Sequence, residues 1–171
     1  MDHGGEICMH VIVSILVGLI LGGGIGAVLV ARKYIIQRNE IDDNRKKMAE
    51  FYDLLVQWLN NIQEDNSIDT YLVKNGYKTV AIYGMKEVGQ LLYNEIAKSD
   101  VEVKYVIDKN AENLDCEVPC YKPDHNLEQV DCVIVTAIHY FDEIKTDLLS
   151  IIESDILSVE DLVYGVNQDI V

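Results

Sequence analysis

The chain has 171 residues, enough for about one domain of ordinary size and an accessory segment. Its formal net charge is −15, and residues 48–171 alone hold 24 acidic side chains against eight basic ones. So acidic a surface repels phosphate backbones, which argues against nucleic acid as a partner. Any bound nucleotide must therefore be held by backbone N–H groups and a few placed side chains.

The cysteines do not form a recognisable metal or redox motif. Cys116 and Cys120 are separated by three residues, which is neither the CxxC redox spacing nor half of a convincing zinc site. Cys132 falls in an apolar strand pattern, and Cys8 is close to the N-terminus. We expect free thiols in a reducing compartment and no metal site.

Residues 11–31 read VIVSILVGLILGGGIGAVLVA, an apolar run of 21 residues without a charge. About 20 apolar residues in a helix span the hydrocarbon core of a bilayer. A cleaved signal peptide would need a basic flank and a shorter apolar run, whereas residues 1–10 are acidic. The pattern predicts an uncleaved, single-pass transmembrane helix over residues 11–31.

A basic cluster sets the expected orientation of this helix. Residues 32–47 hold six basic side chains against three acidic ones. Because Lys and Arg beside a span stay on the cytoplasmic side, residues 1–10 should be extracytoplasmic and the rest of the chain cytoplasmic. We therefore expect the protein in the cell (inner) membrane, with its main domain inside the cell.

Three glycines recur every four residues within the predicted span, at Gly18, Gly22 and Gly26. Their spacing forms two overlapping GxxxG motifs on one helix face, which let another helix approach closely. The alternative is that small residues are simply common in membrane helices. A homodimer, or docking on a partner helix, through this face is one hypothesis that the sequence leaves open.

Residues 32–65 are predicted to form a juxtamembrane amphipathic helix, with its helical pattern running from about residue 33 to residue 63. Apolar residues recur every seven positions, and a second series follows three residues later. The two series are Ile41, Met48, Leu55 and Ile62, and then Asn44, Phe51 and Trp58. Either this helix forms a short coiled coil, or residues 48–63 pack on the following domain; we favour the second.

From residue 66 to residue 171 the pattern is that of a small α/β domain. Short β-branched runs alternate with amphipathic helices, which predicts a Rossmann-like, mostly parallel sheet flanked by helices. The expected strands are residues 79–83, 101–107, 131–136 and 156–159, with a short strand at 117–121. The expected helices are residues 68–74, 86–97 and 141–152, with a closing turn at 160–164.

In such sheets, ligands bind at the carboxyl ends of the strands, near the point where the strand order reverses. The segments that follow three expected strands, residues 84–89, 108–109 and 136–140, should therefore form a cleft. The first of them reads GMKEVG, which resembles the dinucleotide-binding pattern G-x-G-x-x-G with Lys86 at its middle glycine. Asp108 comes at the end of the second strand, where an acidic residue binds ribose.

These observations give a set of candidate ligand-binding residues, each with a structural alternative. Gly84 and Gly89 are needed for strand–helix packing even without a ligand, Asp108 and Lys109 fit a solvated turn, and a His at a helix start often only caps it. The candidates are Gly84, Met85, Lys86, Gly89, Asp108, Lys109, Thr136 and His139. No catalytic residue is assigned, because the chain has no nucleophile elbow, Walker A or HExxH motif.

Several segments resemble a Rossmann-like domain found in bacterial surface-polysaccharide gene clusters. They are residues 58–59 (WL), 82–85 (IYGM), 105–110 (YVIDKN) and 131–137 (DCVIVTA). Residues 118–121 (VPCY) are also similar to a strand in the nucleotide-sugar-binding N-terminal domain of sugar acyltransferases. The resemblance covers about residues 50–165 and implies binding of NAD(P) or a nucleotide-sugar. The acyltransferase half has no counterpart in the chain.

The leading hypothesis is a membrane-tethered, cytoplasmic module that binds a nucleotide or nucleotide-sugar in surface-polysaccharide biosynthesis. It would be non-catalytic alone and would work beside polysaccharide-biosynthesis enzymes. One alternative is an NAD(P)-dependent enzyme that acts on an activated sugar. The other is a non-catalytic scaffold whose fold serves protein interaction.

Overall fold

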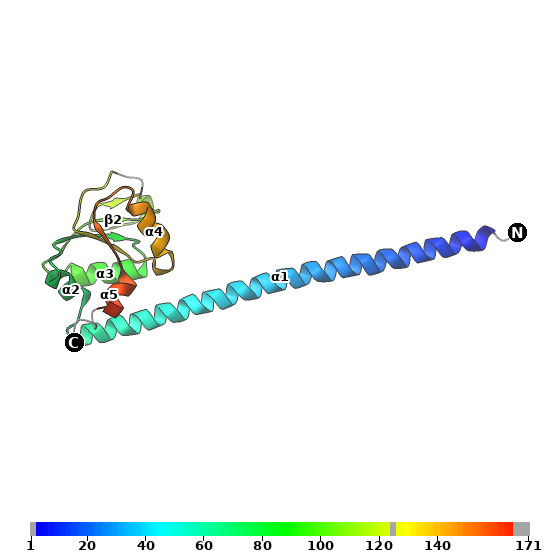
Figure 1. Ribbon diagram of the computed structural model, residues 1–171, viewed down its shortest axis with the longest axis horizontal. Helices are drawn as coiled ribbons and strands as arrows, with labels where there is room; N and C mark the ends of the chain where they lie inside the picture. Colours follow the sequence, from blue (N-terminus) through cyan, green and yellow to red (C-terminus); the bar gives the residue numbers. More distant parts are fainter. Residues whose placement is uncertain (1–2, 124–125, 166–171) are drawn as a thin grey trace. The chain divides into compact units, whose positions relative to one another are not determined.

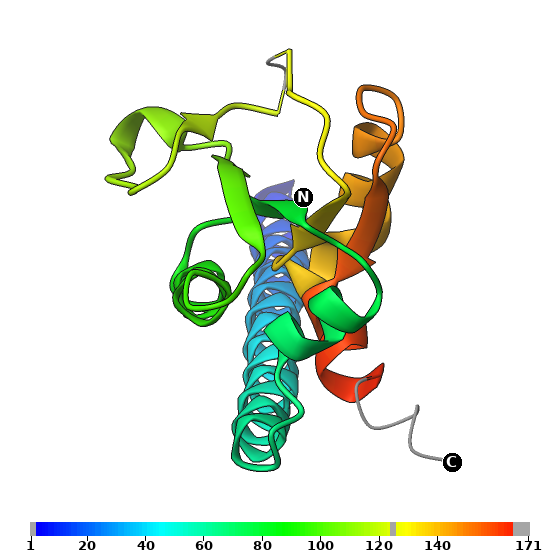
Figure 2. The same ribbon diagram turned by 90° about the vertical axis from the view of Figure 1, so that its left-hand side faces the viewer.

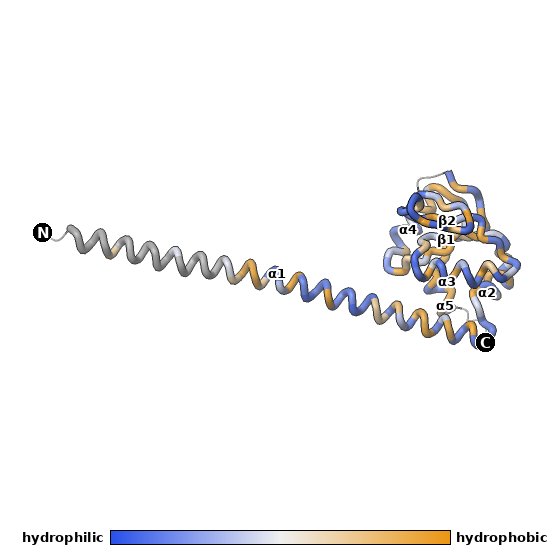
Figure 3. Tube along the Cα trace, turned by 180° about the vertical axis from the view of Figure 1, so that it is seen from behind, coloured by the Kyte–Doolittle hydropathy of each residue, from blue (hydrophilic) through white to orange (hydrophobic). Residues whose placement is uncertain are grey.

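The computed structural model describes residues 3–123 and 126–165, with the side chains of residues 3–25 described only at Met9 and Gly18. Two compact units divide the chain, residues 1–49 and residues 50–171. Helix α1, His3–Gln63, belongs to both of them (Figure 1). Its hydropathy changes from a polar middle stretch to a mixture of apolar and polar residues near its C-terminal end (Figure 3).

No helix within the described residues is long and apolar enough to cross a membrane. Most residues of the predicted span, 11–31, have side chains outside the described part of the structure, and Gly22 is one of them. The same holds for nearly all of residues 1–10. The span, its orientation and the glycine face therefore stay predictions.

Residues 50–171 are built around a five-stranded parallel sheet. The strand order is β3-β2-β1-β4-β5, which is the order of the first five strands of a Rossmann fold. The predicted α/β class and Rossmann-like topology are thus confirmed. The strands are β1 Thr79–Tyr83, β2 Glu102–Ile107, β3 Cys120–Tyr121, β4 Cys132–Val135 and β5 Asp155–Ser158.

Helices cover both faces of the sheet, because alternate residues of each buried strand point to opposite sides. In β1, Val80 and Ile82 join one apolar cluster, and Ala81 and Tyr83 join the other. Figure 2 shows α3 (green) and α4 (orange) with strands between them. The first cluster is covered by α1, α2 Ile68–Lys74, α3 Glu87–Ile96 and α5 Val159–Gly165, and the second by α4 Phe141–Leu148.

Residues 50–63, the last part of α1, belong to this unit. Leu54 and Trp58 are almost completely buried in the first cluster. The Asn61 side-chain amide donates a hydrogen bond to the Val163 carbonyl oxygen of α5 at 2.6 Å. Residues 51–61 therefore pack on the α/β domain, as the favoured alternative for residues 48–63 predicts.

The element boundaries differ from the expected ones in a few places. Strand β3 has two residues instead of five, since Pro119 has no N–H to extend the pairing. Helix α4 ends at Leu148 rather than at residue 152, and β5 begins one residue early, at Asp155. The expected bounds of β1 and α2 match the structure.

Candidate functional site

A cleft of about 580 Å³ lies at the carboxyl ends of three neighbouring strands. Strands β2 and β4 flank β1, so this is the point where the strand order reverses and where ligands bind in open parallel sheets. The cleft is lined by Phe51, Tyr83, Gly84, Lys86, Glu87, Val88, Asp108, Lys109, Asn110, Thr136, Ala137, Ile138, His139, Tyr140, Glu143 and Ile144.

The turn after β1 depends on its two glycines. Gly84 has a φ of +91°, a left-handed conformation that favours glycine, and its N–H donates to the Ile107 carbonyl oxygen at 2.8 Å. A Cβ atom on Gly89 would lie 2.0 Å from the Gly84 carbonyl oxygen. Any residue with a Cβ atom at position 89 would therefore clash with Gly84, so glycine is what allows the start of α3 to pack this closely on the end of β1.

Asp108 fastens this turn to the end of β2. Its Oδ2 atom accepts the Met85 N–H at 3.0 Å, and its Oδ1 atom accepts the Asn110 N–H at 2.8 Å. The Asp108 N–H in turn donates to the Tyr121 carbonyl oxygen of β3 at 2.9 Å. Asp108 is half-buried, and each of its carboxylate oxygens already accepts one hydrogen bond. Each oxygen can still accept a further hydrogen bond from a ligand hydroxyl.

Thr136 ties the end of β4 to the same turn. Its hydroxyl lies 3.0 Å from the Tyr83 carbonyl oxygen and 2.9 Å from that of Gly84. Beyond it, the Nδ1 atom of His139 lies 3.5 Å from a carboxylate oxygen of Glu50 on α1. Thr136 thus shapes the cleft, and His139 is placed at its edge by α1.

The charges around the cleft are mixed. Lys86 precedes α3 without a side-chain cap, and Lys109 is exposed after β2. Glu87, Asp108 and Glu143 supply three carboxylates. Burial raises the pKa of Tyr83, and the neighbouring Asp108 carboxylate raises it further. A phosphate here would rely on α3 N–H groups and the lysines, since no net positive field surrounds it.

The structure brings six of the eight predicted site residues to the cleft wall. The other two, Met85 and Gly89, lie behind it: the Met85 side chain is buried in the first apolar cluster, and Gly89 packs on Gly84. Sequence reasoning missed Phe51 and Glu143, which line the cleft from α1 and α4. Phe51 was visible only as one apolar residue of an amphipathic helix, and nothing in the sequence marked Glu143.

The arrangement is suited to binding. Aromatic and aliphatic side chains line much of the cleft, with Asp108, Asn110 and Thr136 as polar groups at the strand ends. Comparison with known protein families, with characterised proteins and with solved structures found no significant match to this chain.

Proposed function

We propose that the cleft binds a nucleotide or a nucleotide-sugar. The observation that carries this proposal is the convergence, at the switch point of the sheet, of the glycine turn, the start of α3 and the Asp108 carboxylate. The diphosphate lies at the first turn of α3, whose N–H groups have no partners within the helix. The ribose hydroxyls lie near Asp108, and the base lies against the apolar wall.

Residues 11–31 tether this module to the membrane in the proposal, with residues 50–171 on the cytoplasmic side. Its support is the uncharged run of 21 residues followed by six basic side chains. Pairing of two copies through Gly18, Gly22 and Gly26 belongs to the same proposal. The role in surface-polysaccharide biosynthesis, beside the enzymes of that pathway, is supported by the resemblance of residues 50–165.

The experiment is thermal unfolding of the whole 171-residue chain with NAD, NADP, UDP-sugars, GDP-sugars and coenzyme A. A ligand present at about 100 times its dissociation constant adds roughly 2.7 kcal/mol to the free energy of unfolding. We expect one of these ligands to raise Tm by several degrees. If none of them does, the cleft is not a nucleotide site.

A matched pair of lysine variants locates the ligand. Lys86→Ala removes an ammonium from the cleft wall, whereas Lys98→Ala removes one just after the C-terminal end of α3, outside the cleft lining. Both lysines are exposed, so both variants should keep the fold. We expect ligand affinity to change only in Lys86→Ala. Equal affinities in the two variants and the unaltered chain would place the ligand elsewhere.

A protein-interaction scaffold is the second candidate function, and the hydrogen bonds that Asp108 already makes favour it. Both carboxylate oxygens already accept backbone N–H groups, so the residue has a structural role without any ligand. The scaffold predicts no thermal shift with any nucleotide. It also predicts cross-linking of the chain to other proteins in intact membranes.

A further inference from the structure

An apolar stripe runs along the last part of α1, on a different face from the one that is buried in the core. It consists of Tyr52, Leu55, Leu59 and Ile62, which follow one another at intervals of three, four and three residues. Leu55 is half-buried, and the other three side chains are exposed. Apolar residues at alternating intervals of three and four are the pattern by which one helix packs along another. The stripe is therefore suited to contact with a helix.

The C-terminal part of this stripe borders an apolar groove of about 440 Å³. The exposed Leu91 side chain of α3 contributes to the groove from the other side. Glu95 also lines it, but its carboxylate oxygens already accept the Trp58 and Ile68 N–H groups. The groove therefore offers apolar contact, and its partly buried carboxylate needs no basic group from a partner.

The charges around the groove favour a second copy of this chain as its occupant. Besides Glu95, two charged residues line the groove, Asp69 and Lys98, and both also line a neighbouring cavity, so they lie close together. One acid beside one base is complementary to its own copy, because a two-fold axis lets each Asp69 meet the partner's Lys98. Residues 48–171 otherwise carry 24 acidic side chains against eight basic ones, so most other faces of two copies repel each other.

We propose that the stripe and the groove form a homodimer interface, in which α1 of each copy lies in the groove of the other. The interface is two-fold symmetric, so the Leu59 side chain of each copy contacts the apolar wall of its partner. The two α1 helices run parallel; this orientation rests on the proposed tether, since both spans then enter one membrane. The contact itself lies within residues 50–171 and needs neither the tether nor a nucleotide.

The interface is small, so pairing depends on concentration. The stripe extends over about three helical turns, whereas stable free dimers bury about 1,000 Å² or more. Dilute chains are therefore monomeric. Chains held at an effective concentration of about 1 mM, as linked or tethered modules are, form the dimer.

Disulfide cross-linking tests the contact and its direction. In the whole chain, every cysteine except the buried Cys132 is replaced by serine. Leu59→Cys then places a thiol on the stripe, and Asn60→Cys places one at the next position, which is also exposed but lies on another face. At a chain concentration of about 1 mM in mild detergent, oxidation should join two chains several-fold faster through position 59 than through position 60.

Ile62→Cys, three residues further along the stripe, should also join to its own copy, because parallel helices bring equal positions together. Equal rates at positions 59 and 60, or no covalent dimer, would refute the interface. Cross-linking at position 59 without cross-linking at position 62 would refute the parallel orientation.

Charge reversal tests the pairing of Asp69 with Lys98. Lys98→Glu places two acids against each other across the interface, and Asp69→Lys places two bases there. Each change alone should raise the dimer dissociation constant several-fold, and the double variant should restore it. Sedimentation equilibrium of the whole chain at concentrations up to about 1 mM measures these constants. Single variants that dimerise normally, or a double variant that does not recover, would refute this pairing.

Two exposed leucines give a matched control for the stripe. Leu59 is 56% exposed and Leu149, which follows α4 outside the groove lining, is 60% exposed. Leu59→Asp should raise the dimer dissociation constant at least tenfold, because it places a charge in the apolar contact, whereas Leu149→Asp should leave it unchanged. Equal weakening by both variants would show that added charge, and not the stripe, controls assembly. Neither measurement uses a nucleotide, so failure of the proposed cleft would leave the result unaffected.

Discussion

Glu95 is the residue through which three helices of the α/β unit are connected. It lies on α3, and its carboxylate accepts the Trp58 indole N–H of α1 at 2.5 Å and the Ile68 N–H of α2 at 2.6 Å. Hydrogen bonds to a charged, partly buried group are stronger than average. A single side chain thus satisfies two donors that would otherwise lie unpaired beside the core.

We predict that Glu95→Gln lowers the free energy of unfolding by about 1–3 kcal/mol, because glutamine keeps one acceptor and turns an NH₂ group toward a donor. The control is Glu153→Gln, an exposed carboxylate after α4, which should change it by about 0.5 kcal/mol or less. Urea unfolding of both variants measures the difference. Equal effects would mean that the Glu95 contacts contribute nothing to stability.

The pH dependence of this effect follows from the direction of the pKa shift. Burial raises the pKa of Glu95 above its ordinary value of 4.5, although the Trp58 and Ile68 hydrogen bonds oppose the rise. Its contribution is therefore complete below the unfolded pKa and falls as pH rises through the raised folded pKa. The stability gap between the unaltered chain and Glu95→Gln should narrow over that interval.

Among the elements, α1 is unusual because its last part, residues 50–63, is apolar on two faces. One face is buried: Leu54 is 1% exposed. The other is not: Leu59 is 56% exposed, and it borders an apolar groove beside α3. The same helix therefore completes the core of residues 50–171 and presents apolar side chains to its surroundings.

Two leucine-to-alanine variants five residues apart distinguish these faces. Leu54→Ala should cost about 2–5 kcal/mol, as for a large-to-small change in a packed core. Leu59→Ala should cost about 0.5 kcal/mol or less. Denaturant unfolding of the two variants at the same protein concentration checks this. A similar cost at both positions would indicate that the exposed face is packed against another helix.

Elements and topology were accessible from the sequence because local patterns encode them. The β-branched runs at β1 and β4 and the 3.6-residue periodicity of α3 are sufficient to predict a parallel α/β sheet. The cleft was predictable only in part. That Asp108 follows β2 is a local property, whereas its bond to the Met85 N–H and the approach of Phe51 depend on tertiary packing between distant segments. Sequence reasoning has no access to such contacts.

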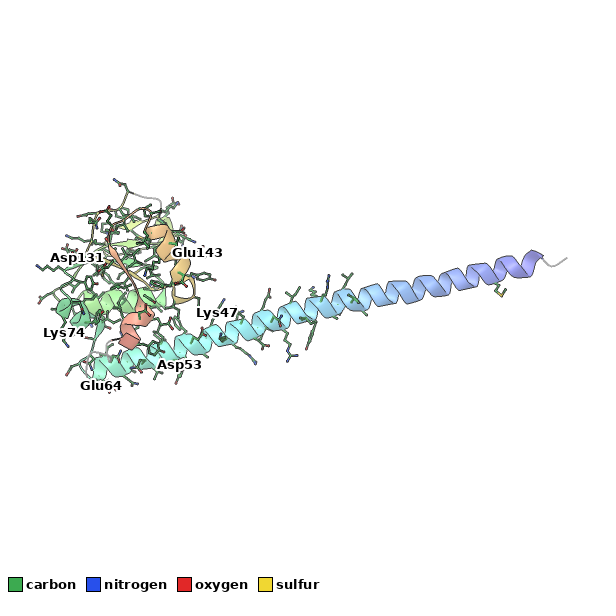
Figure 4. All side chains as sticks on the ribbon, viewed as in Figure 1. Lys47, Asp53, Glu64, Lys74, Asp131 and Glu143 are labelled. Atoms are coloured by element: carbon green, nitrogen blue, oxygen red, sulfur yellow. The ribbon has the colours of Figure 1, made fainter. Side chains whose placement is uncertain are left out.

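At the scale of the whole molecule, excess negative charge is the dominant feature. The chain holds 29 acidic residues against 14 basic ones. Asp53, Glu64, Asp131 and Glu143 carry their carboxylates on the surface (Figure 4). Self-repulsion among such groups opposes the compact state, which holds them closer together than an unfolded chain does.

We predict that salt stabilises the protein. Raising NaCl from about 0.02 M to about 0.5 M shortens the Debye length severalfold, so Tm should rise by a few degrees as the repulsion is screened. The control is the same change made near pH 4.5, the pI of the sequence, where the effect should nearly vanish. A Tm that falls with salt at pH 7 would show that attractive ion pairs outweigh the repulsion.

The central position of β1 has a consequence for how the chain folds. Strand β1 pairs with β2 after a single intervening helix, but its other neighbour, β4, begins only at Cys132. Closing that longer loop costs more chain entropy, so we expect the edge of β1 that faces β4 to pair after the edge that faces β2. Such an edge is where nascent chains associate with one another. The net charge of −15 keeps those chains apart while the edge is open.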